Sequence, residues 1–246
     1  MKIRASALGG LMTNSRNGKT LGETAITTLR DTYIESRYGR RKEIYSKYLK
    51  KGIEVEESSI ELLSERDGEI YFKNDERKEN DWISGECDID NDSHDEIIDI
   101  KSSWDIYTFW NAKPPIEVKG NKSKLTGYGW QLTAYGWLWN RKNLRLAYVL
   151  SDTPEEIVEG TIYKNALGMP GGDSNPEYDK MAIEVRKQHT FSEISINERV
   201  RDFRFTIDPN DIDAIKHRVD ACQKIVNFWD ENTLHAPIPL DYISIQ

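Results

Sequence analysis

Two charged side chains interrupt an otherwise apolar run at residues 97–101, Ile-Ile-Asp-Ile-Lys. The isoleucines predict a β-strand over 94–102, in which successive side chains point to opposite faces of the sheet. Asp99 and Lys101 therefore share one face, and the isoleucines beside them share the other. A carboxylate and an ammonium spaced in this way usually form a surface ion pair, so the motif alone gives weak support for a catalytic site.

A second carboxylate, Asp88, lies in the preceding predicted strand at 82–90. Asn91-Asp92-Ser93 suits the turn of a hairpin between the two strands, which places Asp88 within a few residues of the partner of Asp99. Like charges held this close repel unless a proton or a cation compensates them. Oxygen ligands favour hard ions, so we expect Mg²⁺ or Mn²⁺, with Ca²⁺ also suited.

Glu56 is the third candidate ligand. A helix is predicted from Gly52 to about Glu65, with Ile53, Ile60 and Leu63 along its apolar stripe, and Glu56 falls on that stripe. A carboxylate that faces a core is costly unless it is paired or bound to a metal ion. The alternative is that Glu56 pairs with a buried lysine or arginine.

An EF-hand is a competing interpretation of the same acids, because the segment Asp88–Ser93 resembles the start of a calcium loop. Ser93 stands where that loop requires glycine, and Asp99 stands where it requires glutamate. The flanking segments are also predicted as strands instead of helices. The EF-hand interpretation is therefore disfavoured.

A helix rich in aromatic residues is predicted over 122–141. Gln131 and Tyr135 lie four residues apart on it and therefore face the same way. An amide and a phenol can orient a phosphate or a nucleic-acid strand. Taken alone, the pair is explained better by a core-forming helix with Gln131 at its edge.

The remaining elements complete an α/β pattern over one domain, 1–246, with a mixed β-sheet flanked by helices, a helical N-terminal part and a C-terminal helical extension. We expect helix over 20–51 with a possible break at Gly39, strands at 69–73 and 144–152, a helix begun by Thr153-Pro154 with a capping threonine and proline in its first turn, a loop at 165–179, and a helix begun by Asp208-Pro209.

Composition limits the class of protein. The 7 Trp, 12 Tyr and 6 Phe can bury ample surface, and the net charge of −8 argues against a basic nucleic-acid coat, although basic strips occur at 37–51 and 113–145. No apolar run is long enough to span a membrane, and the N-terminus lacks the apolar core of a signal peptide. Cys87 and Cys222 form no disulfide framework, so we expect a cytoplasmic protein.

Together, these motifs resemble the PD-(D/E)XK nuclease superfamily, in its RecB-type and phage lambda-type (YqaJ-like) exonuclease branch. The resemblance covers roughly residues 1–150 and comprises Gly52-x-x-x-Glu56, Gly85-Glu86-Cys87-Asp88, Asp99-Ile100-Lys101 and Gln131-x-x-x-Tyr135, with Arg4-Ala5-Ser6 similar to a segment that approaches a DNA-end phosphate. Asp99 stands where many relatives have glutamate. The four-cysteine cluster of some RecB-type members cannot be built from two cysteines.

The resemblance implies a restriction-endonuclease-like core and a role for each matching residue. Glu56, Asp88 and Asp99 would bind metal with the carbonyl of Ile100, and Lys101 would position the attacking water and offset phosphate charge. Gln131 and Tyr135 would support the site or the bound strand, and Ser6 would contact phosphate.

The implied activity is a deoxyribonuclease that uses Mg²⁺ or Mn²⁺, with two ions expected, and that digests double-stranded DNA from its ends. Phage-type recombination, a single-strand annealing protein as partner and a homo-oligomer follow from the same resemblance. Two alternatives stay open: a non-catalytic DNA-binding or assembly protein that retains the fold, and a structure-specific endonuclease.

Overall fold

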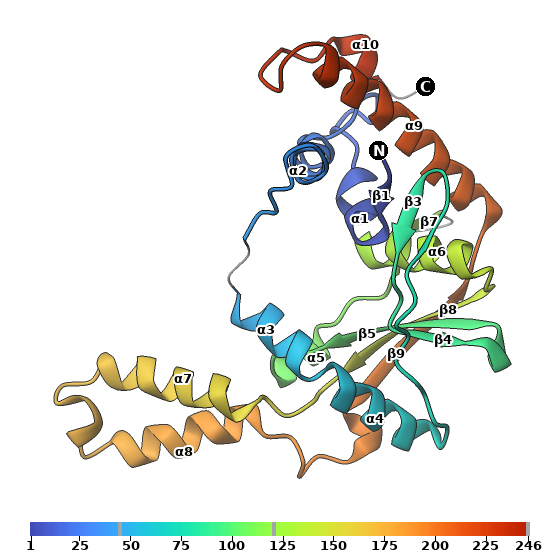
Figure 1. The fold of residues 1–246 in the computed structure, drawn as a ribbon. Helices are drawn as coiled ribbons and strands as arrows, with labels where there is room; N and C mark the ends of the chain where they lie inside the picture. The colour runs from blue at the N-terminus through green and yellow to red at the C-terminus, as the bar shows by residue number, and fades with distance from the viewer. Residues whose placement is uncertain (44–45, 120–121, 245–246) are drawn as a thin grey trace.

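The computed structural model describes residues 1–43, 46–119 and 122–244. Its central sheet has the order β4-β5-β8-β9 (Ile89–Asn91, Glu96–Ser102, Asn143–Val149 and Val200–Thr206), with β5 and β8 parallel and the two outer pairs antiparallel. Helices flank this sheet (Figure 1), so the predicted mixed α/β architecture is confirmed. No helix in these ranges is both long and apolar enough to cross a membrane.

The predicted hairpin exists, but its first strand is shorter than expected. Strand β4 pairs with β5 so that Ile89 faces Ile98, and a short turn, Asp92–His94, joins them. The first half of the predicted strand at 82–90 belongs to a separate small sheet. There, β3 (Ile83–Gly85) lies between β1 (Ile3–Arg4) and β2 (Lys78–Glu79). The chain crosses between the two sheets just before β4, so the prediction of one continuous strand at 82–90 is wrong.

The predicted strand at 69–73 is also wrong, because this segment pairs with no strand in the structure. Ile70 and Phe72 are exposed, while Tyr71 is buried and its backbone N–H donates to the hydroxyl of Ser64 at 3.1 Å. Only the tyrosine of this segment is buried, and it fixes the segment against α4 without forming a sheet.

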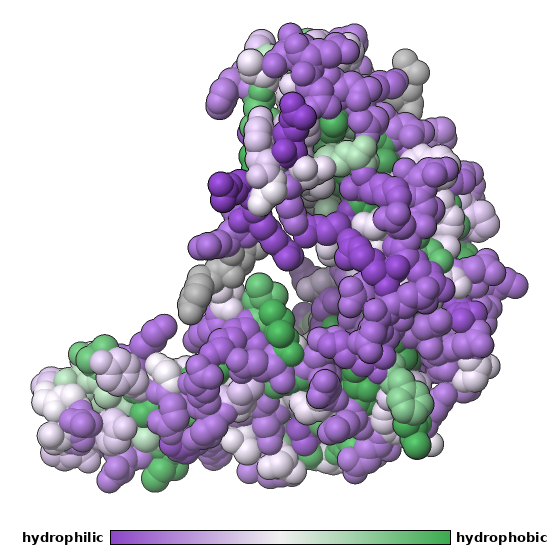
Figure 2. Space-filling view, in the orientation of Figure 1, coloured by the Kyte–Doolittle hydropathy of each residue, from purple (hydrophilic) through white to green (hydrophobic). Residues whose placement is uncertain are grey.

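The helices before the site are divided differently from the prediction. Helix α2 (Glu23–Tyr38) ends at Gly39, whose φ of 63° is the left-handed conformation that glycine adopts readily, so the predicted break is confirmed. Gly52 lies inside α3 (Lys47–Glu54), and the boundary falls instead at Val55, before α4 (Glu56–Asp67). Ile53 is 65% exposed and does not belong to the buried stripe. Apolar atoms over α3 border a hollow in Figure 2.

The aromatic helix α6 (Gly127–Trp139) begins later than predicted, because a hairpin of β6 (Ile116–Lys119) and β7 (Lys122–Leu125) precedes it. The first turn of α6 packs against α1 (Leu8–Leu11). A side-chain carbon at Gly9 would lie 2.7 Å from the Cα atom of Gly127, so the two backbones meet without side chains between them.

The C-terminal half adds a two-helix arm and a long helix. Helices α7 (Glu155–Leu167) and α8 (Tyr178–His189) project from the body as an arm (Figure 1). The predicted cap is wrong, because Thr153 hydrogen-bonds His189 at 3.1 Å and Pro154 precedes the first turn. Asp208 does cap α9 (Pro209–Glu231), as predicted. The shorter helices are η1 (Ala5–Ala7), η2 (Asp92–His94), α5 (Ile106–Trp110), η3 (Gly172–Ser174), η4 (Ile196–Glu198) and α10 (Leu240–Ile243).

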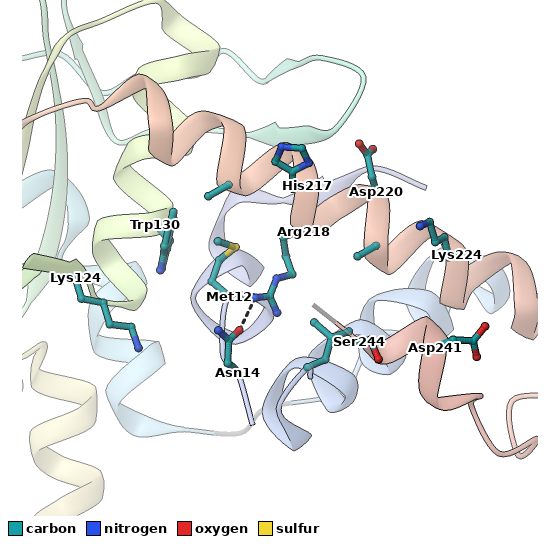
Figure 3. Close-up of a pocket in the computed structure, with 13 residues that line it drawn as sticks. Met12, Asn14, Lys124, Trp130, His217, Arg218, Asp220, Lys224, Asp241 and Ser244 are labelled. Carbon is teal, nitrogen blue, oxygen red and sulfur yellow. Dashed lines mark hydrogen bonds between the residues drawn. The ribbon is translucent and has the colours of Figure 1, made fainter. Parts of the chain in front are cut away.

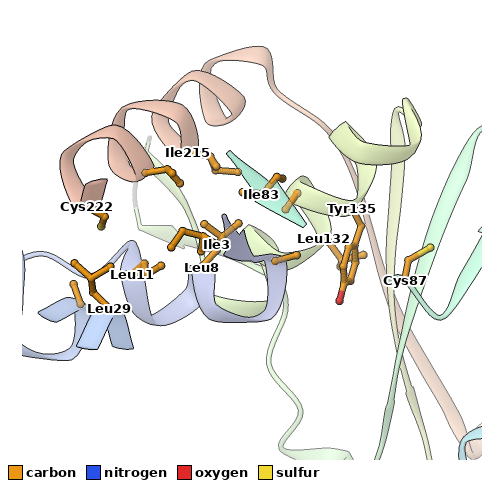
Figure 4. Packing of buried hydrophobic residues seen from close by; sticks show 14 of the residues in the cluster. Ile3, Leu8, Leu11, Leu29, Ile83, Cys87, Leu132, Tyr135, Ile215 and Cys222 are labelled. Atoms are coloured by element: carbon orange, nitrogen blue, oxygen red, sulfur yellow. The ribbon is translucent and has the colours of Figure 1, made fainter. Parts of the chain in front are cut away.

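Each face of the central sheet supports its own core. The larger core joins α1, α6 and α9 to one face and includes Leu132, Leu146 and Ile215 (Figure 4). The smaller core lies under α4 and contains Leu63, Ile98 and Val149 among its members. Alternation along β5 therefore directs Ile98 and Ile100 towards α4, and directs Asp99 and Lys101 towards α6.

One buried charge stands apart from the site. Lys51 of α3 is 1% exposed and donates a hydrogen bond to the backbone carbonyl of Trp104 at 3.0 Å. Burial lowers the pKa of Lys51 to about 8, and the charges of Asp152 and Asp105 offset only part of this effect. The folded protein therefore binds this proton less tightly than the unfolded chain.

The unfolding free energy of wild type is expected to rise relative to that of Lys51→Met as pH rises from about 8 to 10. The lowered pKa penalises the fold while both states are protonated, and loss of the proton from the folded state relieves that penalty, worth about 3 kcal/mol when complete. Urea unfolding of both proteins across this range measures the difference. A pH-independent difference would contradict the assignment.

Candidate active site

Asp99 and Lys101 form the centre of the site. Asp99 is 1% exposed in the middle of the molecule, and its Oδ2 atom lies 2.5 Å from Nζ of Lys101. The Lys101 side chain is 24% exposed, so the pair is buried on its acidic side and open on its basic side. The predicted shared face is therefore confirmed, and the ion pair is not a surface one.

Asp88 joins this pair from the end of the preceding segment. Its Oδ2 atom accepts a hydrogen bond from the backbone N–H of Ile100 at 2.6 Å, one residue from Asp99. Burial and then the charge of Asp99 raise the pKa of Asp88 to about 7, although Lys101 and the Ile100 N–H act in the opposite direction. The two carboxylates therefore repel one another, as the sequence predicts.

Lys101 is held in its charged form. Burial alone would lower its pKa, but the charges of Asp99 and Asp88 outweigh this effect and raise the pKa above its ordinary value. The ammonium also lies 5.2 Å from the ring centroid of Tyr128, in the range of a cation–π contact. One cation thus serves two acids.

Gln131 and Tyr135 extend the site from α6. The Nε2 atom of Gln131 donates to Asp99 Oδ1 at 3.3 Å and to the hydroxyl of Tyr135 at 3.0 Å, so the two side chains do face the same way. Burial, followed by the charge of Asp99, raises the pKa of Tyr135. A side-chain carbon at Gly85 would lie 2.7 Å from the Tyr135 ring, so a glycine is needed there for the ring to pack.

Glu56 stands apart from these residues. It occupies the first turn of α4, and its Oε2 atom lies 3.1 Å from Nζ of Lys73, which is exposed and is not the buried partner that the alternative interpretation expected. Its charge still contributes to the raised pKa of Asp88. Within 1–43, 46–119 and 122–244, no three His, Cys, Asp or Glu side chains are grouped closely enough to hold a metal ion.

The donor set nevertheless suits a hard divalent cation. The Oδ2 atom of Asp99 is buried and, in the part of the chain that the structure describes, has no hydrogen-bond partner of good geometry, although the Lys101 ammonium is close. Carboxylate oxygens of Asp88 and Glu56 and the backbone carbonyl of Ile100 are ligands of the kind that Mg²⁺ prefers. The metal roles of these residues stay predictions.

Ser6 lies beside this cluster in a cavity of about 220 Å³. The cavity, here called the arginine cavity, is lined by Ser6, Ser84, Tyr135 and the arginines at 4, 41 and 77 among others. Sequence reasoning identified Ser6 and Arg4 through one motif and counted Arg41 in a basic strip, but it missed Arg77. Only the fold brings these three arginines together, since no local pattern joins them.

A larger cavity, of about 640 Å³, lies away from the acidic cluster (Figure 3). Trp130 and Lys124 form one side of it, and Arg218 of α9 another. Arg218 is buried and donates to the backbone carbonyl of Leu11 at 3.1 Å. Its guanidinium therefore joins α9 to the N-terminal segment, and none of the predicted site residues lines this cavity.

Asp88→Asn is expected to raise the unfolding free energy by more than about 1 kcal/mol at pH 8 in EDTA. The raised pKa of Asp88 means that its stabilising protonated form is lost as pH rises from about 4 to 7, whereas the asparagine keeps a neutral oxygen for the Ile100 N–H. The gain should vanish near pH 4. Urea unfolding at both pH values measures it.

Asp90→Asn is the matched control on β4, because Asp90 is bonded twice by the Arg141 guanidinium, at 2.7 and 3.1 Å. Loss of this charge should lower the stability of the protein. Destabilisation by both variants would contradict the assignment of repulsion to Asp88.

Comparison of the whole fold with solved structures finds similar proteins. A phage-related exonuclease from Haemophilus somnus 129PT is 29% identical, with a TM-score of 0.69 over 94% of this chain and 96% of that one. An alkaline exonuclease from Laribacter hongkongensis is 14% identical, with a TM-score of 0.59 over 94% and 90%, and its complex with dAMP gives 0.58. No protein-family model and no curated protein matches the chain. The resemblance to the phage lambda-type exonuclease branch of the PD-(D/E)XK nucleases, predicted from the motifs, is confirmed by the similarity to the phage-related exonuclease.

Proposed function

We propose that this chain is a divalent-metal-dependent exodeoxyribonuclease that digests double-stranded DNA from its ends. The observation that carries the proposal is the cluster of Asp88, Asp99 and Lys101, in which a buried acid and a half-buried acid share one cation. A structural ion pair needs only one acid. The second acid leaves negative charge that a divalent ion would neutralise.

Glu56, Asp88, Asp99 and the Ile100 carbonyl would hold the ion. A bound Mg²⁺ or Mn²⁺ supplies a Lewis acid and a water of lowered pKa, and a second ion would stabilise the leaving oxygen. The chain supplies the orientation of these groups: the Ile100 N–H fixes Asp88, and the Gln131 amide fixes Asp99.

Lys101 provides the positive charge for the reacting phosphate. Its raised pKa keeps the ammonium protonated, and its partial exposure leaves it accessible to a ligand. An ammonium directed at a phosphate oxygen stabilises the charge that develops during hydrolysis. The lysine therefore binds and orients the scissile group.

The arginine cavity supports a preference for DNA ends. Arg77 donates to the hydroxyl of Ser84 at 3.0 Å, while Arg4 pairs with Glu35 through contacts of 2.8 and 3.1 Å. Arginines and hydroxyls converging on a small cavity suit a terminal phosphate, which carries more negative charge than an internal one. Ser6 and Tyr135 connect this cavity to the acidic cluster.

Asp99→Ala and Lys101→Ala are each expected to lower the rate of digestion of linear duplex DNA by at least roughly a hundredfold, because each removes charge that the transition state needs. Activity should require Mg²⁺ or Mn²⁺ and stop in EDTA. Release of acid-soluble nucleotides measures the rate.

Glu56→Gln and Glu57→Gln form a matched pair on the first turn of α4, since Glu57 is exposed and Glu56 is the proposed ligand. Only Glu56→Gln should reduce activity. If Asp99→Ala digested DNA as fast as wild type, the catalytic role proposed for the acidic cluster would be wrong. If wild type bound DNA without digesting it, the chain would be a non-catalytic DNA-binding protein. Cleavage of covalently closed circles would identify an endonuclease instead.

Wild type is expected to digest duplexes with phosphorylated ends several-fold faster than the same duplexes after phosphatase treatment, and Arg77→Gln should abolish this difference. Initial rates on the two substrates measure it. Arg37→Gln is the control, because Arg37 belongs to the basic strip but does not line the cavity. It should affect both substrates equally. A preference that survives in Arg77→Gln would remove the arginine cavity from end recognition.

The annealing-protein partner, the homo-oligomer and the role in recombination stay predictions from the resemblance.

A further inference from the structure

A second cavity adjoins the acidic cluster, because Gln131 in its wall bonds Asp99. It measures about 420 Å³, and Tyr128, Tyr148 and Gln131 line it together with Ser6. Ser6 also lines the arginine cavity, and Gln131 contacts both Asp99 and Tyr135. The two cavities therefore share Ser6, and the hydrogen-bonded pair of Gln131 and Tyr135 connects them beside Asp99.

The two tyrosine rings define the shape of this second cavity. They meet edge to face, with centroids 6.4 Å apart and an interplanar angle of 72°. The Tyr148 hydroxyl donates to the backbone carbonyl of Lys113 at 3.2 Å, which fixes its ring, while Tyr128 is 42% exposed. Backbone from Gly9 and Gly127 lines the cavity where α1 and α6 meet, so side chains do not fill it there.

Charge distinguishes this cavity from its neighbour. Among its lining residues in the described ranges, the charged ones are Lys113 and Glu117, whose charges cancel. The arginine cavity instead has three guanidinium groups and one carboxylate, that of Glu86, in its wall. An aromatic cavity without net charge suits a flat heterocycle, whereas the arginine cavity suits a phosphate.

We propose that this tyrosine cavity holds the nucleobase of the nucleotide that follows the scissile phosphate, stacked on Tyr128. The inference rests on the proposed nuclease function and specifies how its substrate strand is placed. Lys101 would contact the scissile phosphate, and its ammonium lies 5.2 Å from the Tyr128 ring centroid, so a base stacked on that ring would lie next to the phosphate. Because every base has a π-face, such a cavity accepts all four bases.

The placement also gives the strand a direction across the site. With the terminal phosphate in the arginine cavity and the scissile phosphate at Lys101, one nucleotide spans the interval between them, and the next base reaches Tyr128. Water would attack the scissile phosphorus, and the phosphorus–oxygen bond to the terminal nucleotide would break as that oxygen takes up a proton. Each round of hydrolysis would then release a mononucleotide and leave the phosphate on the shortened strand as a new end for the arginine cavity.

An abasic scan tests this inference through binding. Labelled duplexes carry a tetrahydrofuran residue at the first, second or third nucleotide of one end or the other, and their affinity is measured by anisotropy in EDTA. For wild type, loss of the second base should weaken binding roughly tenfold, the usual value of one stacked base. Tyr128→Ala should bind the intact duplex roughly tenfold more weakly than wild type does. Loss of the second base should then cause no further loss of affinity in this variant.

Two variants separate stacking from other effects. Tyr128→Phe retains the ring and should bind as wild type does. Tyr107→Ala removes a tyrosine that is 70% exposed on α5 and does not line the cavity, so it should preserve the full abasic penalty. The inference is overturned if no position shows a penalty that depends on Tyr128.

The outcomes also separate this inference from the proposed function. If wild type digests linear DNA in Mg²⁺ but the abasic residue causes no loss of affinity that depends on Tyr128, the nuclease function is supported and the base-binding role of the tyrosine cavity is wrong. If the loss of affinity depends on Tyr128 but no DNA is digested, the base-binding role of the cavity is supported and the nuclease function is contradicted. Failure to bind DNA at all would contradict both.

Discussion

The shared cation of Asp88 and Asp99 is the interaction on which the rest of the site depends. Asp99 is buried and Asp88 is half-buried beside it, where uncompensated charge is costly. One ammonium, one backbone N–H and one amide reduce that cost without removing it. A fold that keeps such a pair gives up stability, which a cation bound as proposed would restore.

The opposite face of the sheet supplies rigidity. Arg145 of β8 is 0% exposed, and its guanidinium bonds Asp202 of β9 at 2.6 Å and lies 2.7 Å from Asp67 of α4. Tyr71 donates to Asp67 at 3.0 Å and accepts from Arg145 at 3.3 Å. Arg66 pairs with the same two acids, so two positive charges compensate two negative ones and fix α4 against the sheet. The helix that presents Glu56 is therefore held at its C-terminal end.

Short-range periodicity accounts for what the sequence predicted well. The face shared by Asp99 and Lys101 needs only strand alternation, and the direction shared by Gln131 and Tyr135 needs only helical spacing. The errors have long-range causes. The strand at 82–90 divides between two sheets because β1 and β2 supply partners for its first half, and Ile53 lost its predicted burial when the helix boundary moved from Gly52 to Val55. Arg77 could not be found by any local pattern, since its neighbours in space come from the N-terminus and from β3.

The net charge of −8 becomes compatible with a DNA substrate once charge is considered by region instead of in total. Arginines gather in one small cavity, and acids are concentrated elsewhere, for example at Glu155 and Glu156 where the projecting arm begins. An acidic surface repels duplex DNA from most of the molecule and leaves few places where a phosphate is bound favourably. A terminal phosphate in the arginine cavity and a neutral base against Tyr128 would then be recognised by different forces, the first sensitive to salt and the second largely independent of it. Separate recognition of phosphate and base suits an enzyme that has to bind each new end and release each product without recognising the base sequence.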